Sequence, residues 1–333
     1  MGKWFSKVSK REDILVVPSF EMSALFDKRE TSYEYVFVVC CHGQRTPLTE
    51  CTNLPKEESE DYGRMTAAGR EQTVEMGRRL RSRYLSILTG QPGDVIATHN
   101  QNPCTEDSVR LILEGLDIPP TTPFKDNTDY MAIYEKSLAQ HYDTIMASAG
   151  HGRFRTIQNM VDFVRDRIGS PSTSQNATLL CLDSLRTHVV NGHPMPDWAV
   201  ADWDDILSAD RKVFEMALEG IEKPLAEYIL GEILDTLVVM YERGHFRQDK
   251  MHIFTVSDMN LFAVLKLLNR LYDSRPNFGA ALFIEVFRDA EGLRVRILFG
   301  GDVVPLPLRL DRLSNPCPLA NFVAEISHLL GRQ

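Results

Sequence analysis

The sequence lacks long hydrophobic runs. None of its 333 residues belongs to a stretch that approaches the roughly 20 apolar residues a membrane-spanning helix requires. Residues 1–12 are predominantly polar and charged, and neither an extended apolar stretch nor a small-residue cleavage site follows them. This pattern does not resemble a secretory leader. We therefore expect a protein that is neither membrane-spanning nor secreted.

Positive charge is in deficit. The chain carries 37 Lys and Arg against 46 Asp and Glu, a formal net charge of −9. Nucleic-acid backbones require clustered cations on the protein, so this balance argues against a nucleic-acid partner. The one basic cluster, RRLRSR (78–83), falls in a segment with the periodicity of an amphipathic helix. We expect its arginines to lie on a solvated face.

Cysteine is also scarce. No paired framework is evident among the six cysteines, which stand at positions 40, 41, 51, 104, 181 and 317. Such a set suits a reducing compartment, and we expect a cytoplasmic protein. With 43% hydrophobic and 25% charged residues, the chain has an ordinary globular composition and is long enough for two subdomains.

The most informative segment is YVFVVCCHGQRTP (35–47), where an apolar run ends abruptly in polar residues. Such a run is typical of a buried strand, and Gly43 and Pro47 mark its end. His42 and Arg45 are therefore expected at the carboxyl edge of a sheet, where open α/β sheets bind ligands. A guanidinium binds phosphate oxygens and a neutral imidazole can attack phosphorus, so the pair suits phosphate chemistry. A strand end with one hydrogen-bonded histidine explains these residues equally well.

This segment resembles the RHGxRxP signature of the histidine acid phosphatases, branch 2 of the histidine phosphatase superfamily. Other segments are similar to further landmarks of the family, in the same order: GRMTAAGREQTVEMGRRLRSRY (63–84), LEGLDIPP (113–120), MPDW (195–198) and CPLANF (317–322). Together they extend over most of the chain, so the resemblance does not depend on one motif.

The resemblance implies a three-layer α/β fold of the phosphoglycerate-mutase type, a sheet flanked by helices with a mostly helical cap inserted in the chain. We expect a discontinuous core over residues 33–117 and 225–330, a helical cap over 118–224, and an N-terminal tail over 1–32.

Individual strands of the core are also predicted. Short apolar runs predict buried strands at 95–98 and 251–256. Alternating patterns predict an antiparallel pair at 280–289 and 293–301 that closes the edge of the sheet.

The resemblance assigns roles to three residues. It implies that His42 is the nucleophile that forms a phosphohistidine, that Arg45 binds phosphate, and that Asp258 protonates the leaving group. Because His42 and Asp258 each follow a predicted strand, we expect them to converge in one pocket; alternatively, each only terminates its own strand. No cofactor and no metal is expected.

Three cationic or proton-donating positions of the family are replaced. The first Arg of the signature is Cys41, a second phosphate-binding Arg is Cys104, and the His that precedes the proton donor is Ser257. Phosphoryl transfer depends on cations that stabilise the phosphoryl oxygens, and losing one such donor costs roughly 10²–10³ in rate. We therefore predict a catalytically impaired or inactive pseudophosphatase that binds a phosphorylated ligand or a protein partner.

Two alternatives use the same residues. An active acid phosphatase would work through a phosphohistidine on His42, with Arg110 or Lys266 replacing a missing cation. Cys41 and Cys104 could instead form a redox-sensitive disulfide or, with His42 and Asp258, hold a zinc ion. We favour a simpler role for both, since a free cysteine behaves as a small buried hydrophobe.

The N-terminus carries a second motif. MGKWFS matches the M-G-x-x-x-[ST] pattern for N-myristoylation of Gly2, with a basic cluster that comprises Lys3, Lys7, Lys10 and Arg11. One acyl chain anchors weakly, and basic residues supply the usual second signal for an anionic membrane face. We expect peripheral attachment at the inner face of a membrane; the alternative is an unmodified basic tail.

Overall fold

The computed structural model describes residues 32–55, 62–119, 123–171, 174–243, 248–268, 275–299, 302–303 and 316–332. Gly2 and its basic cluster lie outside these ranges. The described residues form two compact units. We name them the sheet unit, formed by residues within 32–44, 67–134 and 218–332, and the helical unit, formed by residues within 45–66 and 135–217. The predicted boundaries of the core and the cap stay a prediction.

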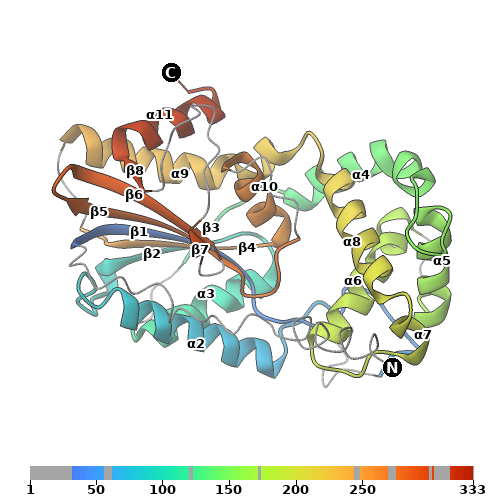
Figure 1. Cartoon of the computed structure of the whole chain (residues 1–333). Helices are drawn as coiled ribbons and strands as arrows, with labels where there is room; N and C mark the ends of the chain where they lie inside the picture. The colour runs from blue at the N-terminus through green and yellow to red at the C-terminus, as the bar shows by residue number, and fades with distance from the viewer. Residues whose placement is uncertain are drawn as a thin grey trace, which may run out of the picture. The chain divides into compact units, whose positions relative to one another are not determined.

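A mixed sheet forms the centre of the sheet unit (Figure 1). Its strands follow the order β3-β2-β4-β1-β5-β6-β7, and β8 also pairs with β6. The strands are β1 (Ser32–Cys41), β2 (Val95–His99), β3 (Phe124–Lys125), β4 (Met251–Val256), β5 (Ala281–Asp289), β6 (Gly292–Phe299), β7 (Asp302–Val303) and β8 (Cys317–Pro318). The α/β fold expected from the sequence is confirmed.

The predicted strands correspond closely to β2, β4, β5 and β6. β2, β4 and β1 are parallel neighbours, whereas β5 runs antiparallel to both β1 and β6. The antiparallel pair is confirmed, but β5 lies inside the sheet between β1 and β6, not at its edge. Every residue of β1 from Tyr35 to Cys41 is buried. Both faces of this strand are therefore covered, which explains its unbroken apolar run.

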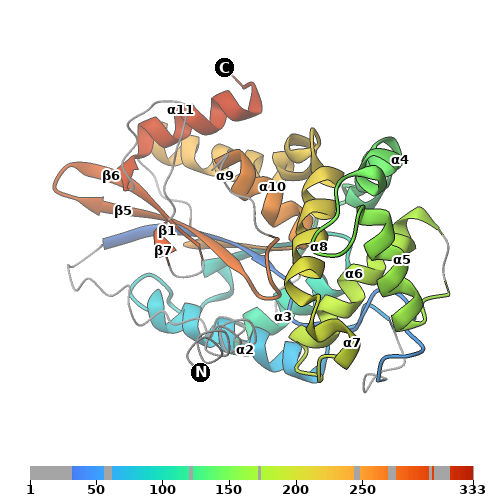
Figure 2. The same cartoon turned by 45° about the vertical axis from the view of Figure 1, so that its right-hand side comes forward.

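Helices cover both faces of this sheet (Figures 1 and 2). One face carries α2 (Ala67–Arg83) and α3 (Pro103–Leu116), and the other carries α9 (Glu222–Arg243), α10 (Asp258–Leu268) and α11 (Leu319–Leu330). A short 3-10 helix, η2 (Pro92–Asp94), precedes β2. Within the described ranges, no helix is both long and apolar enough to cross a membrane.

Helices α2 and α3 approach each other backbone to backbone at Gly77 and Gly115. A Cβ on Gly77 would lie 2.2 Å from the Ile112 carbonyl oxygen, and one on Gly115 would lie 2.1 Å from the Val74 carbonyl oxygen. No residue with a Cβ fits at these distances. The two glycines therefore fix the position of α3 relative to α2.

The helical unit contains α5 (Ile157–Ile168), α6 (Gln175–Val190), α7 (Asp197–Val200), nearly all of α8 (Trp203–Leu218) and most of α4 (Tyr130–Ala147). Side chains at the N-caps start α5 and α6: Thr156 accepts from the N–H of Asn159, and Ser174 accepts from the N–H of Ala177. Every residue of α6 from 181 to 189 is buried, so α6 lies at the core of this unit.

Arg83 contradicts the expectation of a solvated basic face. Arg78 and Arg81 are exposed as expected and Arg79 is half-buried, but the Arg83 side chain is only 3% exposed. Its Nε and Nη2 donate to Glu285 Oε1 at 2.9 and 2.6 Å. Glu285 is completely buried on β5, and a buried carboxylate requires a positive partner. The ion pair with Glu285 therefore buries Arg83, the last residue of α2, although the helical pattern predicted an exposed side chain there.

Candidate active site

Strands β1 and β4 end side by side at the carboxyl edge of the sheet. Cys41 is in register with Val256, and the backbone N–H of His42 donates to the Val256 carbonyl at 3.3 Å. Ser257 and Asp258 follow β4 directly, and Asp258 is the first residue of α10. The structure therefore brings His42 and Asp258 to one edge of the sheet, as the strand pattern predicted.

His42 is buried, and two contacts orient its ring. Nδ1 lies 2.9 Å from the carbonyl oxygen of Gly43, and the ring centroid lies 5.6 Å from that of Phe278, with an interplanar angle of 35°. A carbonyl oxygen only accepts, so Nδ1 carries a proton, and in a neutral ring Nε2 is the nitrogen with the lone pair. A nucleophilic imidazole requires this tautomer with Nε2 as the attacking atom.

Gly43 fixes the chain immediately after His42. Its N–H donates to Ser108 Oγ on α3 at 3.1 Å. A Cβ at this position would lie 2.5 Å from both the Gly69 carbonyl oxygen and Thr73 Oγ1 on α2. Only glycine fits against α2 at such distances, so the position of the His42 backbone depends on both helices.

Asp258 is held in an ion pair with Arg275. Nε and Nη2 of Arg275 both donate to Asp258 Oδ2, at 2.9 and 2.8 Å. Asp258 Oδ1 accepts the backbone N–H of Met259 at 3.0 Å. The side chains of Arg275 and Asp258 are 11% and 22% exposed. Three donors on one carboxylate favour its ionised form.

Ser257 uses its hydroxyl inside the sheet unit. Its Oγ donates to Asn260 Oδ1 at 2.6 Å. Asn260 Oδ1 also accepts from Asn100 Nδ2, at 3.2 Å. Asn260 Nδ2 donates to the Leu225 carbonyl at 2.9 Å. All three polar side chains are buried. The position that holds His in the family therefore belongs to a network of uncharged groups.

Cys41 and Cys104 are both buried, and neither is part of a disulfide. Cys41 ends β1, and Cys104 lies in the first turn of α3, where its N–H donates to the capping side chain of Asn102 at 2.9 Å. A disulfide between them is not formed in this structure. Across the part of the chain that the structure describes, no group of three or more His, Cys, Asp or Glu side chains is arranged to hold a metal ion.

Arg45 belongs to the helical unit. It is buried, and its Nη2 donates to both carboxylate oxygens of Asp183 on α6, at 3.3 and 3.0 Å. Nη1 donates to the Thr46 carbonyl at 3.1 Å, and Asn191 Nδ2 donates to the Arg45 carbonyl at 2.9 Å. The charge of the predicted phosphate-binding arginine is therefore balanced by a buried carboxylate.

Comparison with known proteins links this arrangement to a family. No family model matches the chain. Testicular acid phosphatase of Mus musculus is 25% identical over 338 residues, which cover 86% of this chain and 78% of that protein. Lysosomal acid phosphatase of Rattus norvegicus is 23% identical over 327 residues, which cover 88% of this chain and 77% of that protein. Over most of its length, the chain is therefore similar to acid phosphatases.

Solved structures agree on the fold of this acid phosphatase-like chain. The phytase of Citrobacter braakii superimposes with a TM-score of 0.64 at 16% identity, covering 91% of this chain and 98% of that one. The multiple inositol polyphosphate phosphatase of Bifidobacterium longum, in complex with inositol hexasulfate, superimposes with a TM-score of 0.61 at 11% identity, covering 92% and 94%. At these identities the likeness establishes the fold alone.

The cations considered as replacements in the acid phosphatase-like site are placed differently. Arg110 is 55% exposed on α3 and donates from Nη2 to Glu106 Oε1, one turn earlier, at 2.9 Å. Lys266 lies in the last turn of α10, at the opposite end of that helix from Asp258. The cation that contacts Asp258 is Arg275, which stands in no recognised motif and which no sequence pattern indicated.

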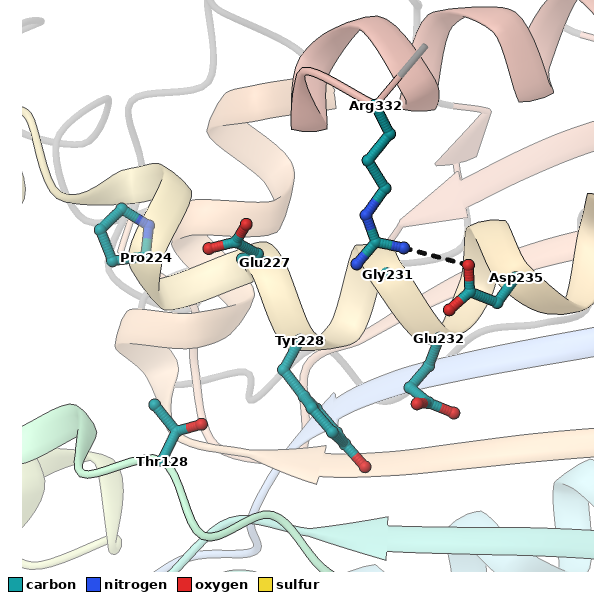
Figure 3. Close-up of a pocket in the computed structure, with 8 residues that line it drawn as sticks. All are labelled: Thr128, Pro224, Glu227, Tyr228, Gly231, Glu232, Asp235 and Arg332. Atoms are coloured by element: carbon teal, nitrogen blue, oxygen red, sulfur yellow. Dashed lines mark hydrogen bonds and ion pairs between the residues drawn. The ribbon is translucent and has the colours of Figure 1, made fainter.

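A pocket of about 290 Å³ lies along α9 in the same unit. Its lining, drawn in Figure 3, consists of Thr128, Pro224, Glu227, Tyr228, Gly231, Glu232, Asp235 and Arg332. Arg332 donates to Asp235 at 3.0 Å, and two further carboxylates leave the lining acidic. An acidic lining does not suit a phosphate group, and none of these residues belongs to the predicted site.

Proposed function

We propose that this acid phosphatase-like protein is catalytically impaired and binds a phosphorylated small molecule or protein without efficient turnover. The observation that carries the proposal is the replacement of three cationic or titratable groups at the sheet edge by uncharged side chains. Cys41, Cys104 and Ser257 are buried and uncharged where the family has two arginines and a histidine. The Ser257 hydroxyl is also committed to Asn260.

The expected loss of rate follows from the chemistry. Charge on the phosphoryl oxygens develops in the transition state, and each preorganised donor that is lost costs roughly 10²–10³ in rate. Losses within one site are not additive, so the three replacements do not multiply. Turnover should nevertheless fall by at least about 10³ relative to an intact site. The retained tautomer of His42 supports slow phosphohistidine formation, not its complete absence.

The alternative is an active phosphomonoesterase with a phosphohistidine on His42. The orientation of the His42 ring by Gly43 favours it, because an unused histidine does not need a nucleophilic tautomer. In that case Arg275 is a better candidate for the additional cation than Arg110 or Lys266, because it contacts Asp258.

The experiment compares wild type with His42→Ala in hydrolysis of p-nitrophenyl phosphate between about pH 4 and pH 8. We expect very slow turnover. Calorimetry with inorganic phosphate measures binding separately, and we expect binding to persist in the wild type. Fast hydrolysis that His42→Ala abolishes would contradict the impaired state and establish the alternative. Absence of both hydrolysis and phosphate binding would refute the phosphorylated-ligand proposal.

A membrane location remains a separate proposal that rests on the motif at Gly2. The protein would attach to the inner, anionic face of a membrane through a myristoyl group and the nearby basic residues. Mass spectrometry of the N-terminal peptide and flotation with anionic vesicles, with Gly2→Ala as the control, measure this directly. An unmodified Gly2 in a myristoylating host would refute it.

A further inference from the structure

One segment contacts both reacting groups at the sheet edge. It lies between α10 and β5, and its described part begins at Arg275, which pairs with Asp258. Three residues later, the Phe278 ring lies against the ring of His42. The N–H of Gly279 then donates to the His42 carbonyl at 2.9 Å. The conformation of this segment therefore joins Arg275 to the same edge as the nucleophile.

The Arg275–Asp258 pair is more than a surface ion pair. Exposed ion pairs such as Arg110–Glu106 are screened by water and are worth little. Arg275 and Asp258 are both largely shielded, and two guanidinium nitrogens converge on one carboxylate oxygen. The remaining oxygen accepts the Met259 N–H. Protonating Asp258 would weaken these bonds, because the guanidinium would then face a neutral acid.

A working phosphatase of this chemistry needs a protonated Asp258. Nε2 of His42 forms a bond to phosphorus while the ester P–O bond breaks, and the departing oxygen takes the electron pair and a proton from Asp258. Water then attacks phosphorus, the P–N bond breaks, and the proton of the water returns to Asp258 as phosphate leaves. A carboxylate has no proton to give in the first step. Only esters whose leaving groups depart as stable anions escape this requirement.

We propose that Arg275 is a positioning residue that holds Asp258 as a carboxylate and thereby suppresses protonation of the leaving group. The inference rests on the proposed function, since it identifies one cause of the impaired turnover in addition to the lost cations. The resemblance to the family assigns no role to this position.

The test compares two substrates across a set of variants. 2,4-Dinitrophenyl phosphate has a leaving group that needs no proton, whereas glycerol 1-phosphate has one that does. Arg275→Gln should raise kcat/KM for the alkyl ester by at least about 10-fold, since general acid catalysis contributes roughly 10²–10⁴. The same variant should change kcat/KM for the aryl ester by less than about 3-fold. Adding Asp258→Asn should cancel the gain, and Arg275→Lys, which keeps the charge, should behave as wild type.

Other outcomes contradict the inference, the proposed function or both. An equal fall in kcat/KM for both esters in Arg275→Gln would show that Arg275 binds the phosphoryl group. An equal rise in kcat/KM for both esters would show that the substitution changes the site in general and not the protonation of the leaving group. Fast wild-type hydrolysis of the aryl ester alone would refute the proposed function but leave this inference standing. Fast wild-type hydrolysis of the alkyl ester that Asp258→Asn abolishes would refute both.

A second measurement tests the protonation state of Asp258 even if turnover is undetectable. Infrared difference spectra of wild type, Arg275→Gln and Asp258→Asn report the carboxylic acid band of Asp258 directly. Arg275 forms an ion pair with Asp258, and His42 follows β1, the strand that pairs with β4. Arg275→Gln should let Asp258 protonate at a higher pH, because the carboxylate loses its positive partner. An unchanged titration in a variant with unchanged thermal stability would overturn the inference.

Discussion

Replacing Arg45 with Met removes the positive half of a buried ion pair. The side chains of Arg45 and Asp183 are 5% and 3% exposed, so the variant leaves a carboxylate without its counter-charge in the interior of the helical unit. Breaking such a pair from one side costs about 3–5 kcal/mol. Arg110→Met is the matched control, because its partner Glu106 is 46% exposed, and the expected loss there is below about 1 kcal/mol.

The assay is urea unfolding followed by circular dichroism, with the transition of the helical unit analysed separately if the two units unfold in steps. The double variant Arg45→Met/Asp183→Leu should recover most of the loss, because replacing both partners with apolar side chains is often neutral or stabilising. A loss below about 1 kcal/mol in Arg45→Met would refute the reasoning. If Arg45→Met also lost phosphate binding, Arg45 would contact the ligand in addition to Asp183.

Three further predictions concern the sheet edge. Gly43→Ala should destabilise the protein by about 1–3 kcal/mol, because the new Cβ overlaps the backbone of α2; an unchanged melting temperature would contradict this close packing. Ser257→Ala should cost about 1 kcal/mol through its lost bond to Asn260 and leave phosphate binding unchanged in calorimetry, whereas weaker binding would show that the hydroxyl contacts the ligand. Burial raises the pKa of the Cys40 thiol to about 12, so its thiolate forms only well above neutral pH; rapid maleimide labelling of Cys40 in the native protein at pH 7 would contradict its burial.

The sequence predicted those parts of the site that depend on strand ends. The apolar run before His42 and the shorter run before Asp258 indicate buried strands, and parallel pairing of these strands brings both residues to one edge. Local pattern was sufficient because each residue follows its strand directly. The uncharged character of Cys41, Cys104 and Ser257 was also visible in the sequence.

The charge partners could not be predicted in the same way. Asp183 stands 138 positions after Arg45, and Arg275 stands 17 positions after Asp258 in no periodic relation to it. The sequence does not distinguish a buried charged residue from an exposed one, because the partner of a buried charge is set by tertiary packing. The same limit explains Arg83, whose burial is set by Glu285 on a distant strand and not by the helix that carries it.

The hydrogen bonds among Asn100, Ser257 and Asn260 connect the ends of β2 and β4 to α9 through the Leu225 carbonyl. None of these side chains titrates in the physiological range, and none carries a charge that dissolved ions could screen. This part of the edge should therefore keep its shape in acid and at high ionic strength alike. A cleft lined by arginines would bind an anionic ligand more weakly as the salt concentration rises, whereas these uncharged hydrogen bonds should keep their geometry.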